Sequence, residues 1–252
     1  MQTPSFTEGI SSLDLRQRLL RVFYAPRESF AAARAAPTWH DWFVPVAVVC
    51  LLGMASHYLT APVVLDPQSP AIQQQLQSMP EEQRQKTLES MAMYRSQGWM
   101  LVFVGTFTSL LAVGLVLFGV ARLVFQSQAT FQQMLIVKGY ASLVIGVEWV
   151  VRTPLILLRG DPPVQLGPGA LVPEEWARTL AGQVLAGIQL FDLWQAWLIG
   201  LGLAAMTGAP LRRAMYAVLL LWGLWVVGVA GVEMVRPPTP VPSTSVAPPA
   251  AQ

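Results

Sequence analysis

The stretch WMLVFVGTFTSLLAVGLVLFGVA, residues 99–121, contains no charged side chain. An α-helix rises 1.5 Å per residue, so a helix of this length covers roughly 35 Å and exceeds the roughly 30 Å of hydrocarbon in a bilayer. Inside that hydrocarbon the backbone can satisfy its own hydrogen bonds only in a helix or a closed barrel. Residues 99–121 therefore predict a membrane-spanning α-helix.

Four further apolar segments have a similar length. They cover residues 42–61, 139–158, 184–206 and 214–232. Over the whole chain 54% of the residues are hydrophobic and only 12% are charged, against about 25% charged in a typical soluble domain. The sequence thus predicts an all-α fold, a polytopic membrane bundle of five transmembrane helices within residues 42–235.

Arginine and lysine are unevenly divided between the two sides of this bundle. One side carries nine of them in short segments: Arg16, Arg18, Arg21, Arg27, Arg34, Arg122, Lys138, Arg212 and Arg213. The other side carries six, in longer segments that also hold many acidic residues. Short cytoplasmic segments are enriched in Lys and Arg, so we expect a cytoplasmic N-terminus and, with five spans, an outer C-terminus.

Residues 1–41 are predicted to form two short amphipathic helices on the cytoplasmic side. Ser11 and Asp14 have the spacing of a capping box, and apolar side chains follow at helical spacing at Leu15, Leu19, Val22 and Phe23. The basic residues predicted for the membrane surface are Arg16, Arg18, Arg21, Arg27 and Arg34. Such a segment either lies in the interface and attracts anionic lipid or packs against the bundle, and the sequence leaves both readings open.

Two other segments are predicted to lie outside the membrane. Residues 62–98 form the outer connection, and we expect a helical hairpin or cap there, because Ser78 and Pro80 can start a helix and Glu82 and Lys86 are spaced as an i,i+4 pair. Residues 236–252 form a Pro-rich tail with too little apolar surface to fold, so we expect disorder.

Several function classes find no support in the sequence. We see no Gly-rich phosphate loop, no His/Glu zinc pattern and no nucleophile elbow, so we expect no enzyme, no cofactor and no metal. His40 and His57 flank the first span on opposite sides, and the single Cys50 excludes an intrachain disulfide. The net charge of +2 is too small to indicate nucleic acid.

The informative residues are the charges inside the predicted spans, because charge is costly there and usually faces the bundle interior. Glu148 and Arg152 are four residues apart and share one face of the third span. Asp192 lies on the fourth span with Gln189 and Gln195 nearby. We expect the acids and the arginine to meet at a similar depth. This cluster is either an ion-pair network that fixes helix packing or a site for a proton or ligand.

Four stretches together resemble the Yip-domain family of membrane proteins, which is named for Ypt/Rab-interacting proteins. They are LRQRLLRVFYAPRESFAAARAAPTW (15–39), MPEEQRQKTLESM (79–91), ATFQQMLIVKGYASLVIGV (129–147) and LFDLWQAWLIGLGLAAMTGAPLRRAM (190–215). The resemblance covers roughly residues 13–232 and implies a cytoplasmic N-terminus and five spans. Eukaryotic relatives bind prenylated small GTPases in vesicle traffic, an activity that does not carry over to a bacterial cell. The family offers no catalytic residues to transfer.

The arginine-over-lysine bias, with only Lys86 and Lys138 as lysines, is typical of a GC-rich bacterium. With five predicted spans, we therefore expect a multi-pass protein of the bacterial inner membrane. Small residues at every fourth position permit close helix contact, as at Gly105 and Ser109. We therefore expect a non-enzymatic scaffold or accessory protein that binds lipid or other membrane proteins, with the bilayer and a membrane-protein partner or a second copy as partners. The alternative is a transporter or channel component that uses the acid–arginine cluster.

Overall fold

The computed structural model describes residues 13–159, 167–173, 175–176 and 179–235, and within them every regular element is helical. Five helices there are long and apolar enough to cross a membrane. They are α4 (His40–Val64), α6 (Glu81–Gly119, continued by the π-helix η1, Val120–Val124), α7 (Phe131–Arg159), α9 (Leu190–Thr207) and α10 (Leu211–Val235). The predicted all-α bundle with five spans is thus confirmed, whereas its orientation stays a prediction.

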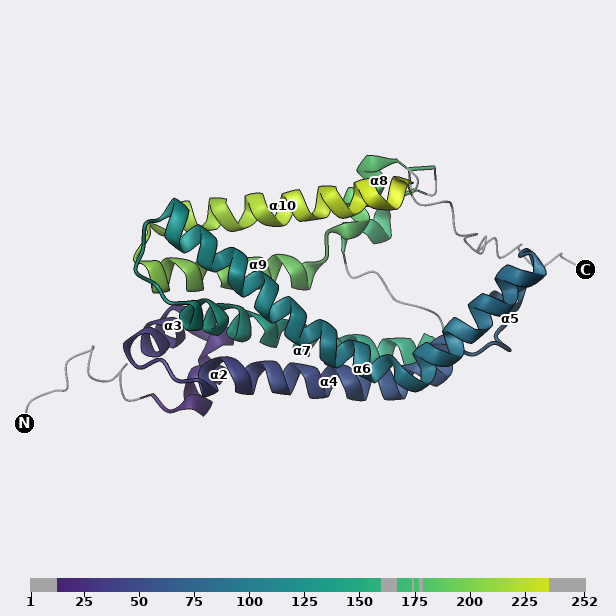
Figure 1. Ribbon diagram of the computed structural model, residues 1–252, viewed down its shortest axis with the longest axis horizontal. Helices are drawn as coiled ribbons and strands as arrows, with labels where there is room; N and C mark the ends of the chain where they lie inside the picture. The colour runs from purple at the N-terminus through teal and green to yellow at the C-terminus, as the bar shows by residue number, and fades with distance from the viewer. Residues whose placement is uncertain (1–12, 160–166, 174, 177–178, 236–252) are drawn as a thin grey trace, which may run out of the picture.

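The five long helices form a row with one helix laid across it. In the order α4, α7, α9, α10 each helix packs on the next, and α6 packs on α4 and α7 (Figure 1). The largest fully buried side chain is Tyr140 of α7, in the middle of this row. Because α6 and α10 pack on different neighbours, a space is left between them, and the candidate site lies there.

The fourth span differs from its prediction. Residues 184–206 were expected as one helix, but the chain forms a short helix α8 (Leu180–Gly187), then a break, then α9 from Leu190. Gln189 at the break is extended, with φ −114° and ψ 149°. Hydropathy does not detect this break, because Gln189 is the only polar residue between Val184 and Phe191. Gly187 and the β-branched Ile188 both favour helix less than Ala or Leu does.

The segment between the first two spans is largely helical. It contains α5 (Pro70–Gln77) and the first part of α6, which begins directly after Pro80. With 39 residues, α6 is about 58 Å long, so its N-terminal part extends well beyond the hydrocarbon. Lys86 Nζ lies 2.6 Å from Glu82 Oε1 on this exposed extension.

The N-terminal helices are α2 (Leu15–Tyr24) and α3 (Pro26–Ala35), with Pro26 at the first position of α3. The cap of α2 is not the expected pair Ser11–Asp14. Asp14 is itself the N-cap: its carboxylate accepts from Gln17 N at 2.7 Å, and the Gln17 side chain accepts from Asp14 N. Glutamine completes a capping box as glutamate does, so the helix starts one turn later. Ser11 and the predicted tail 236–252 lie outside the described residues.

Candidate functional site

Arg152 is the centre of one polar cluster on the face of α7 that meets the α8–α9 break. Its terminal nitrogen lies 2.8 Å from Glu148 Oε1, one turn earlier on the same helix. The same nitrogen donates to Gln189 Oε1 at 2.5 Å, across the break. Arg152 thereby ties the third span to the start of α9. The buried Arg152 Nε has no partner among the described residues.

A second polar cluster lies beside the first and contains a lysine that the sequence analysis placed outside the membrane. Lys138 Nζ donates to Gln195 Oε1 at 3.2 Å, and Gln195 Nε2 donates to the carbonyl of Ala141 at 3.4 Å. Lys138 belongs to α7, and it is buried. Asp192 interacts electrostatically with both Lys138 and Arg152, and it lies in the first turn of α9 because that helix begins at Leu190.

The five residues predicted for this cluster are therefore near one another but divided between two groups. Glu148, Arg152 and Gln189 form one, while Asp192 and Gln195 form the other with Lys138. Lys138 was missed because the third span was predicted to start at residue 139, one residue too late to contain it. The apolar run MLIVKGYASLV (134–144) that surrounds Lys138 was the available signal.

The second group faces a cleft with a volume of about 1100 Å³. One wall is α6, where lining residues recur every three or four positions from Gly105 to Leu117. The opposite wall is α10, with the same periodicity from Val218 to Ala230. Residues of α9 and Lys138 of α7 form the back of the cleft. Residues of α8 also line it. The cleft is thus mostly apolar, with a cation, an anion and an amide on its back wall.

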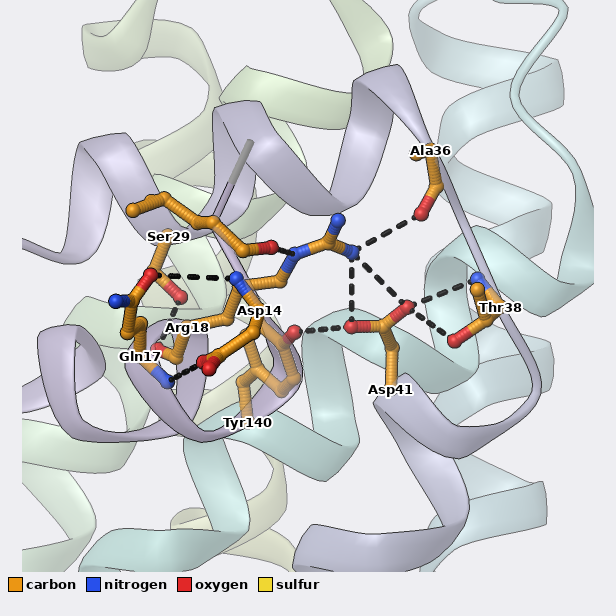
Figure 2. A network of polar contacts seen from close by, with 9 residues as sticks. Asp14, Gln17, Arg18, Ser29, Ala36, Thr38, Asp41 and Tyr140 are labelled. Carbon is orange, nitrogen blue, oxygen red and sulfur yellow. Dashed lines mark hydrogen bonds and ion pairs between the residues drawn. The ribbon is translucent and has the colours of Figure 1, made fainter. Parts of the chain in front are cut away.

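A third polar group joins the N-terminal helices to the bundle, and sequence reasoning missed it entirely (Figure 2). The Asp41 carboxylate, with no solvent exposure, lies 3.3 Å from Arg18 of α2 and accepts from Tyr140 Oη of α7 at 2.5 Å. Thr38 donates to it from N and Oγ1 at 2.8 and 2.7 Å. Arg18 also donates to the carbonyls of Leu13 and Ala36. Every buried charge here has a partner.

This geometry corrects the prediction for the basic N-terminal residues. Arg18 was expected at the membrane surface, but its side chain is buried, where it pairs with Asp41 of α4 (Figure 2). Arg21 is half-buried and pairs with Glu28 of α3. Arg34 donates to the carbonyl of Ala205 at 2.8 Å, near the C-terminal end of α9. The remaining two members of the predicted set, Arg16 and Arg27, are exposed on α2 and α3.

No group of three His, Cys, Asp or Glu side chains in the described ranges could hold a metal ion. The five long apolar helices of the fold define a polytopic helical membrane protein. Over residues 20–232 the chain matches the model of the Yip1 domain, and it belongs to that family, generally one of non-enzymatic membrane proteins. Among curated proteins and solved structures, the comparisons find no match.

Proposed function

We propose that this protein is a scaffold or accessory factor of the bacterial inner membrane that binds lipid or other membrane proteins. The observation that carries the proposal is the fixed position of α2 and α3 on one end of the bundle. Arg18, Asp41 and Tyr140 connect α2 with α4 and α7 through buried charge-assisted hydrogen bonds, which are stronger than neutral ones. The two helices are therefore a rigid platform rather than a flexible tail.

The outer face of this platform combines charge with apolar surface. Arg16, Leu20 and Tyr24 follow one another at i,i+4 spacing on α2 and are all exposed, Leu20 by 53% and Tyr24 by 73%. Arg18 and Val22 occupy the opposite, buried face. A basic helical face with large apolar side chains beside a membrane fits anionic lipid headgroups or a partner that offers both apolar and acidic side chains.

Crosslinking and co-purification of the full chain from native membranes test the proposed function. We expect a recurring membrane protein or retained anionic lipid, and its loss when Leu20→Asp and Tyr24→Asp are combined. A matched control is the double variant Leu219→Asn and Leu220→Asn on α10, which leaves α2 intact. Recovery of a bare monomer with neither partner nor lipid, in every preparation, would overturn the proposal.

A second candidate, a transporter or channel component, is favoured by one observation. The fourth span is interrupted at Ile188 and Gln189, and the interruption lies beside the Arg152–Glu148 pair. Discontinuous helices of this kind form substrate and ion sites in many secondary transporters. Liposomes reconstituted with the full chain test this candidate: flux of ions or dyes above empty controls, lost in Arg152→Leu, supports it, and flux equal to the controls excludes it.

A further inference from the structure

The cleft between α6 and α10 must be occupied when the protein is in a membrane. Its two walls are helix faces whose lining residues extend over about 18 Å, because twelve residues separate Gly105 from Leu117 and Val218 from Ala230. Half of a hydrocarbon core of roughly 30 Å is roughly 15 Å. The cleft therefore has the length of the acyl chains of one leaflet.

The space comes from small side chains on one wall and from separate packing of the two helices. Gly105, Ser109 and Ala112 of α6 line the cleft, and a Cβ added to Gly105 would meet no atom within 4 Å. On the other wall Trp222 and Trp225 of α10 are among the lining residues. Apolar walls of this extent exclude water, so an apolar occupant is required.

Polar groups on the back wall indicate what the other end of the occupant must be. Lys138 is 7% exposed and is held by Gln195. Within the described part of the chain, the Asp192 carboxylate has electrostatic interactions but no hydrogen-bond donor. A carboxylate that faces an apolar cleft is stabilised by a hydrogen-bond donor. The wall thus presents, side by side, a cation and an anion that accepts no hydrogen bond from the described residues.

The positions of these groups along α9 match the order of groups in a lipid. The 18 residues of α9 cover about 27 Å, and Arg34 of α3 contacts its C-terminal end at Ala205, so its first turn, with Asp192, lies at the end away from α2 and α3. Gln195, which holds Lys138, is about one turn deeper. In a zwitterionic phospholipid an outermost ammonium is followed inward by phosphate and ester oxygens, and then by acyl chains.

We propose that the cleft between α6 and α10 binds one zwitterionic phospholipid with a primary ammonium headgroup, from the leaflet away from α2 and α3. Its ammonium donates to Asp192, its phosphate or ester oxygens accept from Lys138, and its acyl chains lie between α6 and α10. The small residues of α6 would also admit a helix of a second copy, but that helix would have to supply its own donor to Asp192 and its own acceptor to Lys138 at this depth. This site deepens the lipid-binding side of the proposed function and rests on it.

Native mass spectrometry of the full chain tests the site. The protein is delipidated in detergent and supplied in turn with phosphatidylethanolamine, phosphatidylcholine and phosphatidylglycerol of identical acyl chains. We expect one phosphatidylethanolamine to be retained in preference to the other two. Asp192→Asn should reduce this retention about tenfold, as expected for the loss of one hydrogen bond to a charged group.

A second pair of variants separates the cleft from the rest of the lipid-facing surface. Ala112→Phe fills the cleft and should remove the bound lipid, whereas Leu115→Phe, on the same helix at a side chain that is 63% exposed, should retain it. Thermal melting in detergent checks that each variant is folded.

Equal retention of the three lipids, or retention unchanged in Asp192→Asn and Ala112→Phe, would overturn the proposal. A lipid-free dimer that Ala112→Phe converts to a monomer would overturn it too and assign the cleft to a second copy. None of these outcomes decides the proposed function, because partner capture through Leu20 and Tyr24 does not depend on the cleft.

Discussion

Asp41 accepts hydrogen bonds from side chains of α2 and α7 and from Thr38 while its own side chain has no exposure. Asp41→Asn keeps the shape but removes the charge that faces Arg18, and it turns an amide N–H₂ toward groups that are themselves donors. Breaking a buried pair by changing one partner costs about 3–5 kcal/mol in soluble proteins. We therefore expect a clearly lower melting temperature in detergent and faster proteolysis of α2 and α3.

The double variant Arg18→Met with Asp41→Asn should recover part of this loss, because no unpaired buried charge then remains. The exposed pair of Lys86 and Glu82 is the matched control, and Glu82→Gln should leave melting unchanged, since exposed pairs contribute little. An Asp41→Asn variant that melts like the wild type would contradict a rigid connection between α2 and the bundle.

Arg152 carries the second prediction at this scale. Arg152→Leu leaves Glu148 without its cation and Gln189 without its donor. Polar pairs inside membranes contribute less than those in soluble cores, so we expect a loss of about 1–3 kcal/mol, read as a lower melting temperature. Adding Glu148→Gln should restore more of the loss than adding Asp192→Asn, because Glu148 is the acid that forms an ion pair with Arg152, whereas Asp192 interacts with it only at longer range. If Arg152→Leu left the melting temperature unchanged, this arginine would instead face a water-filled cavity.

Single residues were the hardest features to predict. The charge pattern of α2 places Arg18 with the solvent-facing arginines, and only the approach of Asp41 and Tyr140 from other helices reverses that. Such a contact depends on tertiary structure and produces no periodic pattern in the sequence. Glu148 and Arg152 could be paired from the sequence, because i,i+4 spacing alone brings them together.

At the scale of the helices, α4 and α7 pack closely at Gly139. A Cβ at this position would lie 3.0 Å from the carbonyl oxygen of Trp42 and 3.1 Å from its Cα, and backbone atoms cannot rotate away. Gly139→Ala should therefore destabilise the protein by about 1–3 kcal/mol, the usual cost of overpacking. Thermal melting of the detergent-solubilised chain measures the change.

Gly223 of α10 provides the same substitution without the contact, since no atom lies within 4 Å of a Cβ added there. Gly223→Ala should be neutral or should raise stability by up to about 1 kcal/mol through helix propensity. If Gly139→Ala and Gly223→Ala changed the melting temperature equally, the contact between α4 and α7 at Gly139 would not be the cause of the effect.

In this chain hydropathy predicts well where the long helices lie, but it predicts poorly whether a helix is interrupted. Each of the five apolar segments overlaps one long helix, because length and composition decide whether a helix can cross. The break between α8 and α9 escaped prediction, since Gly187 and Ile188 lower helix propensity only moderately and do not lower the hydropathy of the segment enough to reveal it. That break sets the position of Asp192. The residues of the candidate site could therefore be predicted from the sequence, but their division into two groups could not.

At the scale of the whole molecule, the charges divide between its two ends. α2 and α3 lie at one end, as do the connection after α6, where Ser127 donates to the carbonyl of Thr207, and the start of α10 (Figure 1). Arg16, Arg27, Arg122, Arg212 and Arg213 are exposed there. Lys138 no longer counts, because it lies inside the bundle, yet the excess of basic residues at this end remains.

Reporter fusions test the orientation that this excess predicts. Fusions after Gly9, near Ser127 and near Pro210 should report the cytoplasm, and fusions near Gln74, Pro168 and Ser243 the outside, because basic residues near short segments are retained in the cytoplasm. The decisive position is Ser243, which follows the fifth long helix. A cytoplasmic signal there requires an even number of crossings. In that case one of the five helices does not span, and α9 is the first candidate, because its 18 residues cover only about 27 Å and it begins at an interruption.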